Sequence, residues 1–333
     1  MDMSYAGKLN CSDPLYDILF TRVCPEVKNP VFHVNIISAL KVYKYTEEKS
    51  STAVIGKFFR MDDPKPGRAL KIRGEYENLR KIRSYGFDRS PNYVVRPISR
   101  DERIGLALVE EFINGVSLDH FLKKAIYGKN VPALKDALSR LASFLHLLHS
   151  RTQRRRGIVL DPICAYYRKV LEKLLRKNII SDDGRKYYIK LIDKWAGKGF
   201  LHRARQTLVH GDATPTNFIF TGRGDVVAID LERMKEADPA FDVGMICGEL
   251  KHAFLWRCGD PYLAEPFIRH FLEGYASFLP SPGLSFRELA RRNPFYMALA
   301  ELRIARNGYL GRDYRKKIAH EAMKCLKWGL RTG

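Results

Sequence analysis

Two short motifs hold carboxylate and amide side chains that could act in one reaction. In the first, His210 and Asp212 are followed by Asn217, with short apolar segments on both sides. In the second, Asp230 follows the apolar residues 226–229. A carboxylate can orient and deprotonate an attacking hydroxyl group, while an amide oxygen and a second carboxylate can hold Mg²⁺ on nucleotide phosphates. The two motifs therefore fit phosphoryl transfer, and their spacing predicts a hairpin that brings Asp212 and Asp230 together.

The elements that must position these residues can be predicted from hydrophobic periodicity. In the first 110 residues, residues 69–84 have the spacing of an amphipathic helix, and residues 15–20 suggest a shorter one. The charged residues 99–102 are typical of a turn. Apolar and polar residues alternate in residues 40–45, and residues 52–59, 93–95 and 106–109 are short, mainly apolar segments; we predict all four to be strands. The first two of these strands should form a hairpin.

After residue 115 the period becomes helical. Leucines at helical spacing predict a long helix around residues 134–148. Short strands around the two motifs, at residues 207–209, 217–220 and 226–229, interrupt the helices. The sequence therefore predicts an α+β fold with two lobes, the first small and rich in strands and the second large and mainly helical.

The motifs resemble the catalytic and metal-binding loops of the aminoglycoside phosphotransferase and choline kinase-like family, which has a protein-kinase-like fold. On this resemblance, Asp212 is the catalytic residue. Asn217 and Asp230 hold Mg²⁺, while His210 and Asp242 support the site structurally. The resemblance also implies ATP or GTP as the phosphoryl donor. It leaves open whether Glu232 contacts a metal ion.

The resemblance extends to the first lobe. Lys57 on the second predicted strand corresponds to the family's phosphate-binding lysine, and Glu75 to the glutamate that pairs with it. Backbone groups of Glu111 and Ile113 would bind the adenine edge. The implied division is a nucleotide-binding lobe over 1–110, a linker over 111–115, and a catalytic and acceptor-binding lobe over 116–333.

The assignments of Lys57 and Glu75 each have an alternative nearby in the sequence, and one motif expected from the family is missing. Lys71 competes with Lys57, although a lysine at a helix start is normally solvated. Glu77 competes with Glu75, but Glu75 shares a helix face with the apolar positions that follow it. No glycine-rich loop precedes the hairpin, and residues 29–35 stand where a phosphate-covering turn would be.

The charge distribution bears on the acceptor. The chain has 58 Lys and Arg against 37 Asp and Glu, a formal net charge of +21. Residues 111–210 have 21 basic and 8 acidic side chains, so +13 of this excess lies between the predicted linker and the catalytic loop. This favours an acidic acceptor, such as a phosphorylated sugar or an anionic glycolipid, over a cationic aminoglycoside.

The sequence leaves other functions open. One is a lipopolysaccharide-core or protein kinase that acts at a membrane surface, with peripheral contact to anionic lipid. Another is a non-catalytic protein on a kinase scaffold that binds nucleic acid or another anionic ligand, which the complete catalytic set disfavours. The chain shows no run of about 18 apolar residues and no signal-peptide core, so we expect a cytoplasmic protein.

Overall fold

The computed structural model describes residues 4–38, 41–59 and 66–332. The chain divides into two compact units. Unit 1 comprises Met1–Val116 and Ile219–Arg233, and unit 2 comprises Ser117–Phe218 and Met234–Gly333. Residues 219–233, which contain Asp230, thus belong with the N-terminal unit, whereas the sequence groups them with the C-terminal lobe. The predicted linker, residues 111–115, also lies in unit 1.

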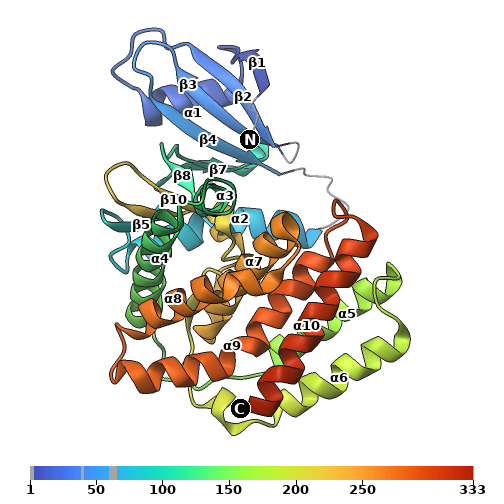
Figure 1. The fold of residues 1–333 in the computed structure, drawn as a ribbon. Helices are drawn as coiled ribbons and strands as arrows, with labels where there is room; N and C mark the ends of the chain where they lie inside the picture. The colour runs from blue at the N-terminus through green and yellow to red at the C-terminus, as the bar shows by residue number, and fades with distance from the viewer. Residues whose placement is uncertain (1–3, 39–40, 60–65, 333) are drawn as a thin grey trace. The chain divides into compact units, whose positions relative to one another are not determined.

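Unit 1 is built on a six-stranded antiparallel sheet in the order β1-β2-β3-β4-β7-β6 (Figure 1). Its strands are β1 (Ser4–Lys8), β2 (Phe32–Ser38), β3 (Val42–Glu47), β4 (Ala53–Phe58), β6 (Pro97–Asp101) and β7 (Leu106–Glu111). β3 and β4 form the expected hairpin, with Tyr45 opposite Val54. Apolar residues of this sheet and of α1 (Pro14–Val23) make one core, in which Leu15, Leu19 and Phe32 are buried.

The structure differs from the sequence analysis at three places in this sheet. β6 includes residues 99–101, which the charge pattern assigns to a turn, and β1 was not predicted. Residues 32–35, predicted to lie in a phosphate-covering turn, are in β2 and pair with both β1 and β3. Neighbouring strands supply the hydrogen bonds of these polar segments, and such pairing overrides weak local propensity. Residues 39–40, between β2 and β3, lie outside the described residues.

A second sheet in the order β5-β11-β10-β8 carries the second motif. Its strands are β5 (Asn92–Val94), β11 (Val226–Ala228), β10 (Phe218–Phe220) and β8 (Val116–Ser117). β9 (Thr207–Val209), which leads to Asp212, instead pairs with β12 (Lys235–Ala237) in a separate two-stranded sheet. β10 and β11 are neighbours in the second sheet, so the chain between Asp212 and Asp230 forms the predicted hairpin, and β9 lies outside it. Tertiary pairing, which the chain spacing does not specify, decides the partner of β9.

Unit 2 is mainly helical. Its long helices are α3 (Leu118–Gly128), α4 (Val131–Arg151), α5 (Asp161–Arg176), α6 (Asp182–Ala196), α7 (Ala240–Cys258), α8 (Glu265–Ala276), α9 (Pro282–Ala305) and α10 (Arg312–Thr332). The leucines predicted to form one face of α4 are buried. Among the described residues, no helix is both long enough and apolar enough to cross a membrane.

Two glycines let α7 and α9 approach closely. A Cβ atom on Gly244 would lie 2.3 Å from the Cβ of Tyr296, and one on Gly248 would lie 2.4 Å from the Cβ of Ala300. Both contacts are far shorter than carbon atoms allow, so only glycine fits at either position. This close approach matters for the site because α7 carries Asp242 and α9 carries Arg303.

Candidate active site

In unit 1, Lys57 lies at the centre of a buried cluster of acidic residues. Its Nζ donates to Glu75 Oε1 at 2.8 Å and lies 3.2 Å from Glu110 Oε1 and 3.9 Å from Asp230 Oδ1. Glu75 comes from α2 (Pro66–Arg83) and is 1% exposed. The structure thus has the pair expected from the sequence. The side chain of Lys71, its rival, lies outside the described residues.

The rival glutamate has different partners. Glu77 lies 3.0 Å from Arg100 and 3.8 Å from Arg80, and its side chain is about half exposed. The helix period explains the difference, since Glu75 shares the face of the buried Leu79.

The sequence did not single out Glu110, which completes this cluster. Ile55 is the register partner of Glu110, so Lys57, two residues beyond Ile55 on the same strand face, is its diagonal neighbour. The available signal was a glutamate at a position that should be buried in a predicted strand. One Oε atom of Glu110 is buried and has no hydrogen-bond partner among the described residues.

The charges in this cluster do not balance. Burial lowers the pKa of Lys57, but Glu110, Glu75 and Asp230 outweigh burial and raise it above its usual value. Burial raises the pKa of both Glu75 and Glu110, against the attraction of Lys57. Three carboxylates thus surround one ammonium group, and the cluster would be stabilised by a further cation.

Asp230 is held at the edge of this cluster by an unusual backbone conformation. Its φ is +63°, in the left-handed region that aspartate tolerates better than most residues. The next residue, Leu231, accepts a hydrogen bond from Asn78 Nδ2 of α2 at 2.8 Å through its carbonyl. The Asp230 side chain remains 38% exposed, so it can reach a ligand. The neighbouring Glu232 pairs with Arg233 at 3.2 Å.

The two residues expected to bind adenine differ in their backbone hydrogen bonds. The N–H of Glu111 donates to the Arg96 carbonyl at 3.1 Å, and its side chain accepts from the Arg96 N–H at 2.7 Å. Ile113 lies just after β7, and within the described part of the chain its N–H makes no backbone hydrogen bond. Of these two N–H groups, only that of Ile113 could therefore donate to a base without first losing a backbone hydrogen bond.

In unit 2, the loop that carries Asp212 is fixed by Asp242 at the start of α7. The Asp242 carboxylate accepts from the backbone N–H of His210 at 2.7 Å and of Gly211 at 3.1 Å. It also contacts His149 Nε2 at 3.2 Å. Asp242 is fully buried, which raises its pKa, but these donors outweigh burial and lower the pKa below its usual value. Asp242 is therefore held as a carboxylate that orders the loop.

Two further residues complete this support. His149 Nδ1 lies 2.8 Å from the hydroxyl of Tyr275, so one buried imidazole links α4, α7 and α8. No local sequence pattern reveals this role of His149. His210 is buried, packs its ring on Phe218 at 5.2 Å and lies with Nδ1 3.4 Å from the Asp212 N–H. Both histidines thus lie where they can keep the loop rigid.

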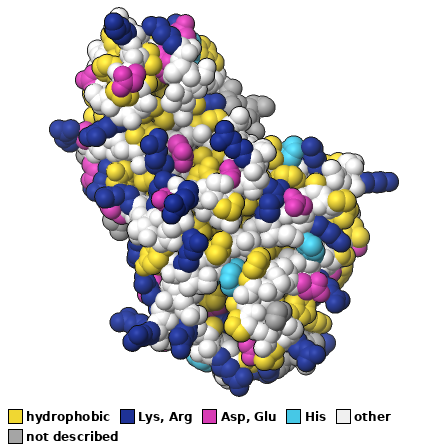
Figure 2. Space-filling view, turned by 90° about the vertical axis from the view of Figure 1, so that its left-hand side faces the viewer, with side chains coloured by type: hydrophobic (Ala, Val, Ile, Leu, Met, Phe, Trp, Pro, Cys, Tyr) yellow, Lys and Arg dark blue, Asp and Glu magenta, His cyan; other side chains and the backbone are white. Residues whose placement is uncertain are grey.

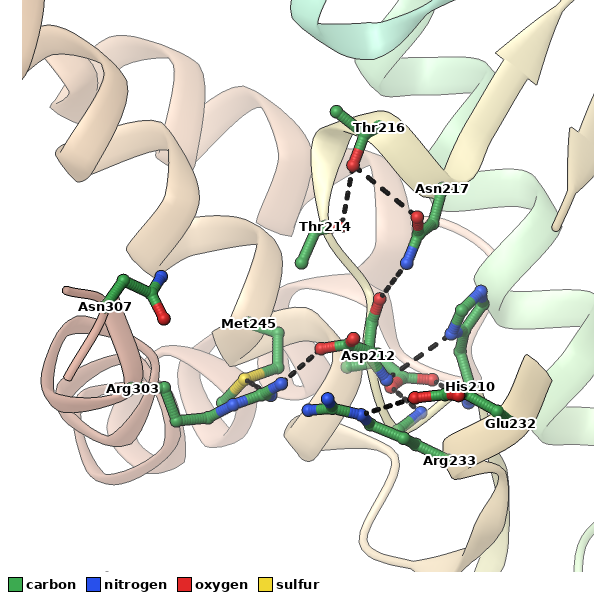
Figure 3. Close-up of polar contacts among 12 residues, drawn as sticks. His210, Asp212, Thr214, Thr216, Asn217, Glu232, Arg233, Met245, Arg303 and Asn307 are labelled. Atoms are coloured by element: carbon green, nitrogen blue, oxygen red, sulfur yellow. Dashed lines mark hydrogen bonds and ion pairs between the residues drawn. The ribbon is translucent and has the colours of Figure 1, made fainter. Parts of the chain in front are cut away.

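The sequence also missed the partner of Asp212, which is Arg303 (Figure 3). Arg303 Nη2 donates to Asp212 Oδ1, and Nη1 lies 2.8 Å from Met245 Sδ. Arg303 is 8% exposed. Because 91 positions separate the two residues, no local pattern could pair them.

Asn217 is oriented by the same loop. Its Nδ2 donates to the Asp212 carbonyl at 2.9 Å, and its backbone N–H donates to Thr214 at 3.0 Å. This leaves Oδ1 as the side-chain atom that could ligate a metal ion. Asn217 in unit 2 and Asp230 in unit 1 offer the oxygen donors that Mg²⁺ prefers, and the excess negative charge around Lys57 fits a divalent cation at Asp230.

Comparisons with known proteins give the family and the fold. The model of a family described as phosphotransferase enzymes matches residues 41–280. No curated protein matches the sequence.

Solved structures show the same fold at low sequence identity. An ethanolamine kinase from Plasmodium vivax is 16% identical, with a TM-score of 0.62 over 95% of this chain and 87% of that chain. A choline kinase from Cryptosporidium parvum is 12% identical, with a TM-score of 0.57 over 95% and 93%. APH(2″)-IIa, in a ternary complex with streptomycin and ATP, is 16% identical, with a TM-score of 0.54 over 96% and 97%.

These findings confirm the expected α+β, protein-kinase-like fold class. The family match spans both units and includes the Lys57 cluster and the Asp212 loop. The chain therefore belongs to the phosphotransferase enzyme family.

Proposed function

We propose that this protein transfers the γ-phosphoryl group of ATP or GTP to a hydroxyl group of a small molecule, with Mg²⁺ as the metal ion. The observation that carries the proposal is the Asp212 loop. One fully buried carboxylate, Asp242, fixes its backbone, and the loop in turn orients Asn217. Structures in the same fold class include complexes with ATP and with GDP, which supports nucleotide use.

The residues of unit 1 would serve the nucleotide. Lys57, held by Glu75, would neutralise charge on the phosphates, and the N–H of Ile113 would donate to the base. Asp230 and Asn217 would hold Mg²⁺, which supplies positive charge that balances the phosphate oxygens. The carboxylates around Lys57 keep it protonated, which this role requires.

Asp212 would act on the acceptor. The acceptor oxygen forms a new bond to the γ-phosphorus, while the bond from that phosphorus to the β,γ-bridging oxygen breaks. The hydroxyl proton passes to the Asp212 carboxylate, and the products are the phosphorylated acceptor and the nucleoside diphosphate. Since the transition state of such transfers is loose, most of the rate enhancement comes from positioning and electrostatics.

The basic charge of unit 2 supports an anionic acceptor, either a sugar or a glycolipid. Of the net +21, +13 lies in residues 111–210, and nearly all of this segment belongs to unit 2. Figure 2 shows Lys and Arg side chains spread over the visible face, with fewer acidic ones. Such a surface would also permit peripheral contact with an anionic membrane.

The test is the substitution Asp212→Ala, with Asp183→Ala as control because the Asp183 side chain is 97% exposed in the same unit. ATP consumption is measured with a panel of neutral, cationic and anionic hydroxyl compounds and with water alone as acceptor. We expect D212A to lose turnover by roughly 10³-fold, the scale of a general base. Calorimetry should show nearly unchanged binding of the nucleotide with Mg²⁺. Full activity in D212A would overturn the proposal.

A further inference from the structure

Asp212 and Asp119, two carboxylates close to Glu249 of α7, have basic partners. Asp212 pairs with the buried guanidinium of Arg303. Asp119 of α3 pairs with Arg257 at 2.7 Å and with Lys123 at 2.8 Å. A cationic acceptor would have to compete with these side chains for the same oxygens.

Glu249 of α7 adds little negative charge to this region. Burial raises its pKa to about 7. Arg303 acts in the opposite direction, but repulsion from Asp212 and Asp119 offsets part of this effect. Much of Glu249 is therefore protonated near neutral pH. Among the described residues, Asp212, Asp119 and Glu249 thus supply little of the free negative charge that a cationic amino alcohol would require.

Basic side chains gather where α5 ends beside the end of α9. α5 carries Lys169, Lys173 and Arg176 at helical spacing, and Arg306 follows the last residue of α9. The two helices contact one another, and Lys177 Nζ donates to the Arg306 carbonyl at 3.2 Å. We call Lys169, Lys173, Arg176 and Arg306 the basic ledge.

The basic ledge has little compensating charge. Among the residues that the structure describes, no carboxylate lies within ion-pair distance of Lys169, Lys173 or Arg306; Glu172, the nearest acidic residue in sequence, pairs with Arg185. Partial burial lowers the pKa of Lys173, and so does repulsion from Arg306, Lys169 and Arg176. Helix C-termini favour cations, which explains Arg176 and Arg306 but not Lys169, two turns before the end of α5.

The basic ledge lies next to the catalytic loop. Arg303 and Arg306 are three positions apart on α9, so their side chains are neighbours on one side, separated by about 4.5 Å along the axis. Arg303 contacts Asp212, and Arg306 faces Lys173. Arg303 thus connects the catalytic carboxylate to the end of α9 at which the basic ledge lies.

We propose that Lys173 and Arg306 bind a phosphate-type anionic group of the acceptor and so determine its specificity. The proposal rests on the proposed function, because it assumes that Asp212 acts on the acceptor hydroxyl. The bound anion would neutralise like charges that now repel one another, and Arg303 would disfavour a cationic acceptor in its place. The anion could come from a free phosphorylated sugar or from a lipid headgroup, since both present the same chemistry.

The test titrates inorganic phosphate and glycerol 3-phosphate into protein saturated with Mg²⁺ and a non-hydrolysable ATP analogue. The analogue fills the positions of the three nucleotide phosphates, so added phosphate reports on another site. The test variant is K173A/R306A, with K173Q/R306Q as a second form that keeps more side-chain volume. The control is K190A/K316A, which removes the same charge from exposed positions of unit 2.

We expect saturable binding of both probes to the wild type and the control, and at least tenfold weaker binding to both test variants. Binding to vesicles with phosphatidylglycerol is compared with binding to neutral vesicles to distinguish the two sources of the anion. If the wild type prefers the phosphatidylglycerol vesicles and the test variants do not, the anion is a lipid headgroup. If the wild type shows no such preference, the acceptor is a soluble molecule. Equal probe binding by wild type and test variants, or none by the wild type, would overturn the inference. Failure of the ATP analogue to bind would instead count against the proposed function.

Discussion

The Lys57 cluster of unit 1 and the Asp212 loop of unit 2 show opposite charge balances. Around Lys57, the carboxylates of Glu75, Glu110 and Asp230 outnumber the one ammonium group. Around Asp212, an arginine pairs with the carboxylate, and further basic residues follow along α9 and α5. The first arrangement suits a cation, such as the metal ion that accompanies a nucleotide, and the second suits an anion.

This difference shows why the total charge of +21 says little about function by itself. A protein that handles a nucleotide with a divalent cation needs local negative charge at the metal, whatever its net charge. The basic excess matters only where it lies next to the reacting group. The following predictions test each half of this comparison.

The largest effect on stability is expected from Lys57→Met. Removing the ammonium group leaves three carboxylates, two of them buried, without their cation, which should cost about 3–5 kcal/mol in the free energy of unfolding. Burial raises the pKa of Glu75 to about 8 and also raises the pKa of Glu110, so less negative charge is left without its cation at pH 5, and the loss should be smaller there than at pH 8. Urea unfolding at the two pH values measures this. In K57M/E110Q part of the loss should be recovered, and a K57M variant as stable as wild type at pH 8 would refute the charge argument.

The next largest effect should come from Asp242→Ala in unit 2. The buried N–H groups of His210 and Gly211 lose their acceptor, which should cost about 3 kcal/mol. Since the pKa of Asp242 is lowered in the fold, its contribution is present at neutral pH and is lost as the pH falls below about 4. Turnover should fall as the loop loosens, while D242N, which retains one oxygen acceptor, should recover part of both properties. Unfolding and turnover unchanged in D242A would show that the loop is held in another way.

Glu249→Gln should have a smaller, pH-dependent effect. The pKa of Glu249 is raised to about 7, above its usual value near 4.5, so the wild type loses stability as the pH rises between these values. The variant does not have this group and should gain about 2–3 kcal/mol over the wild type at pH 8 but little at pH 4.5, since one pKa unit corresponds to about 1.4 kcal/mol. Thermal unfolding across this range measures the difference, with Glu288→Gln as an exposed control on α9. A pH-independent difference would contradict the assignment.

The smallest effect is expected from Lys173→Ala without ligand. Relief of repulsion from Lys169 and Arg176 should stabilise the protein by about 0.3 kcal/mol, as for like charges one turn apart on a helix. Lys190→Ala, on the exposed face of α6, should leave the melting temperature unchanged. The gain should shrink at high salt, because screening weakens repulsion in the wild type. Destabilisation at low salt would mean that Lys173 has a structural role.

The sequence by itself determined the residues whose chemistry depends on local spacing. It identified His210, Asp212 and Asn217 as one loop, and it favoured Glu75 over Glu77 because helix periodicity is local. It also predicted the hairpin that carries Lys57 and the helices of unit 2. These features follow from patterns that repeat within a few residues.

Only the tertiary structure decided the partners of those residues. Glu110 beside Lys57, His149 beside Asp242 and Arg303 beside Asp212 are joined by contacts across 53, 93 and 91 positions of the chain. The pairing of β9 with β12 is of the same kind. Such contacts depend on sheet register and on the close approach of α7 and α9 at two glycines, and neither leaves a periodic signal in the sequence. The charge balance around Lys57 and that around Asp212, and with the latter the inferred acceptor, therefore depend on the packing of the folded chain.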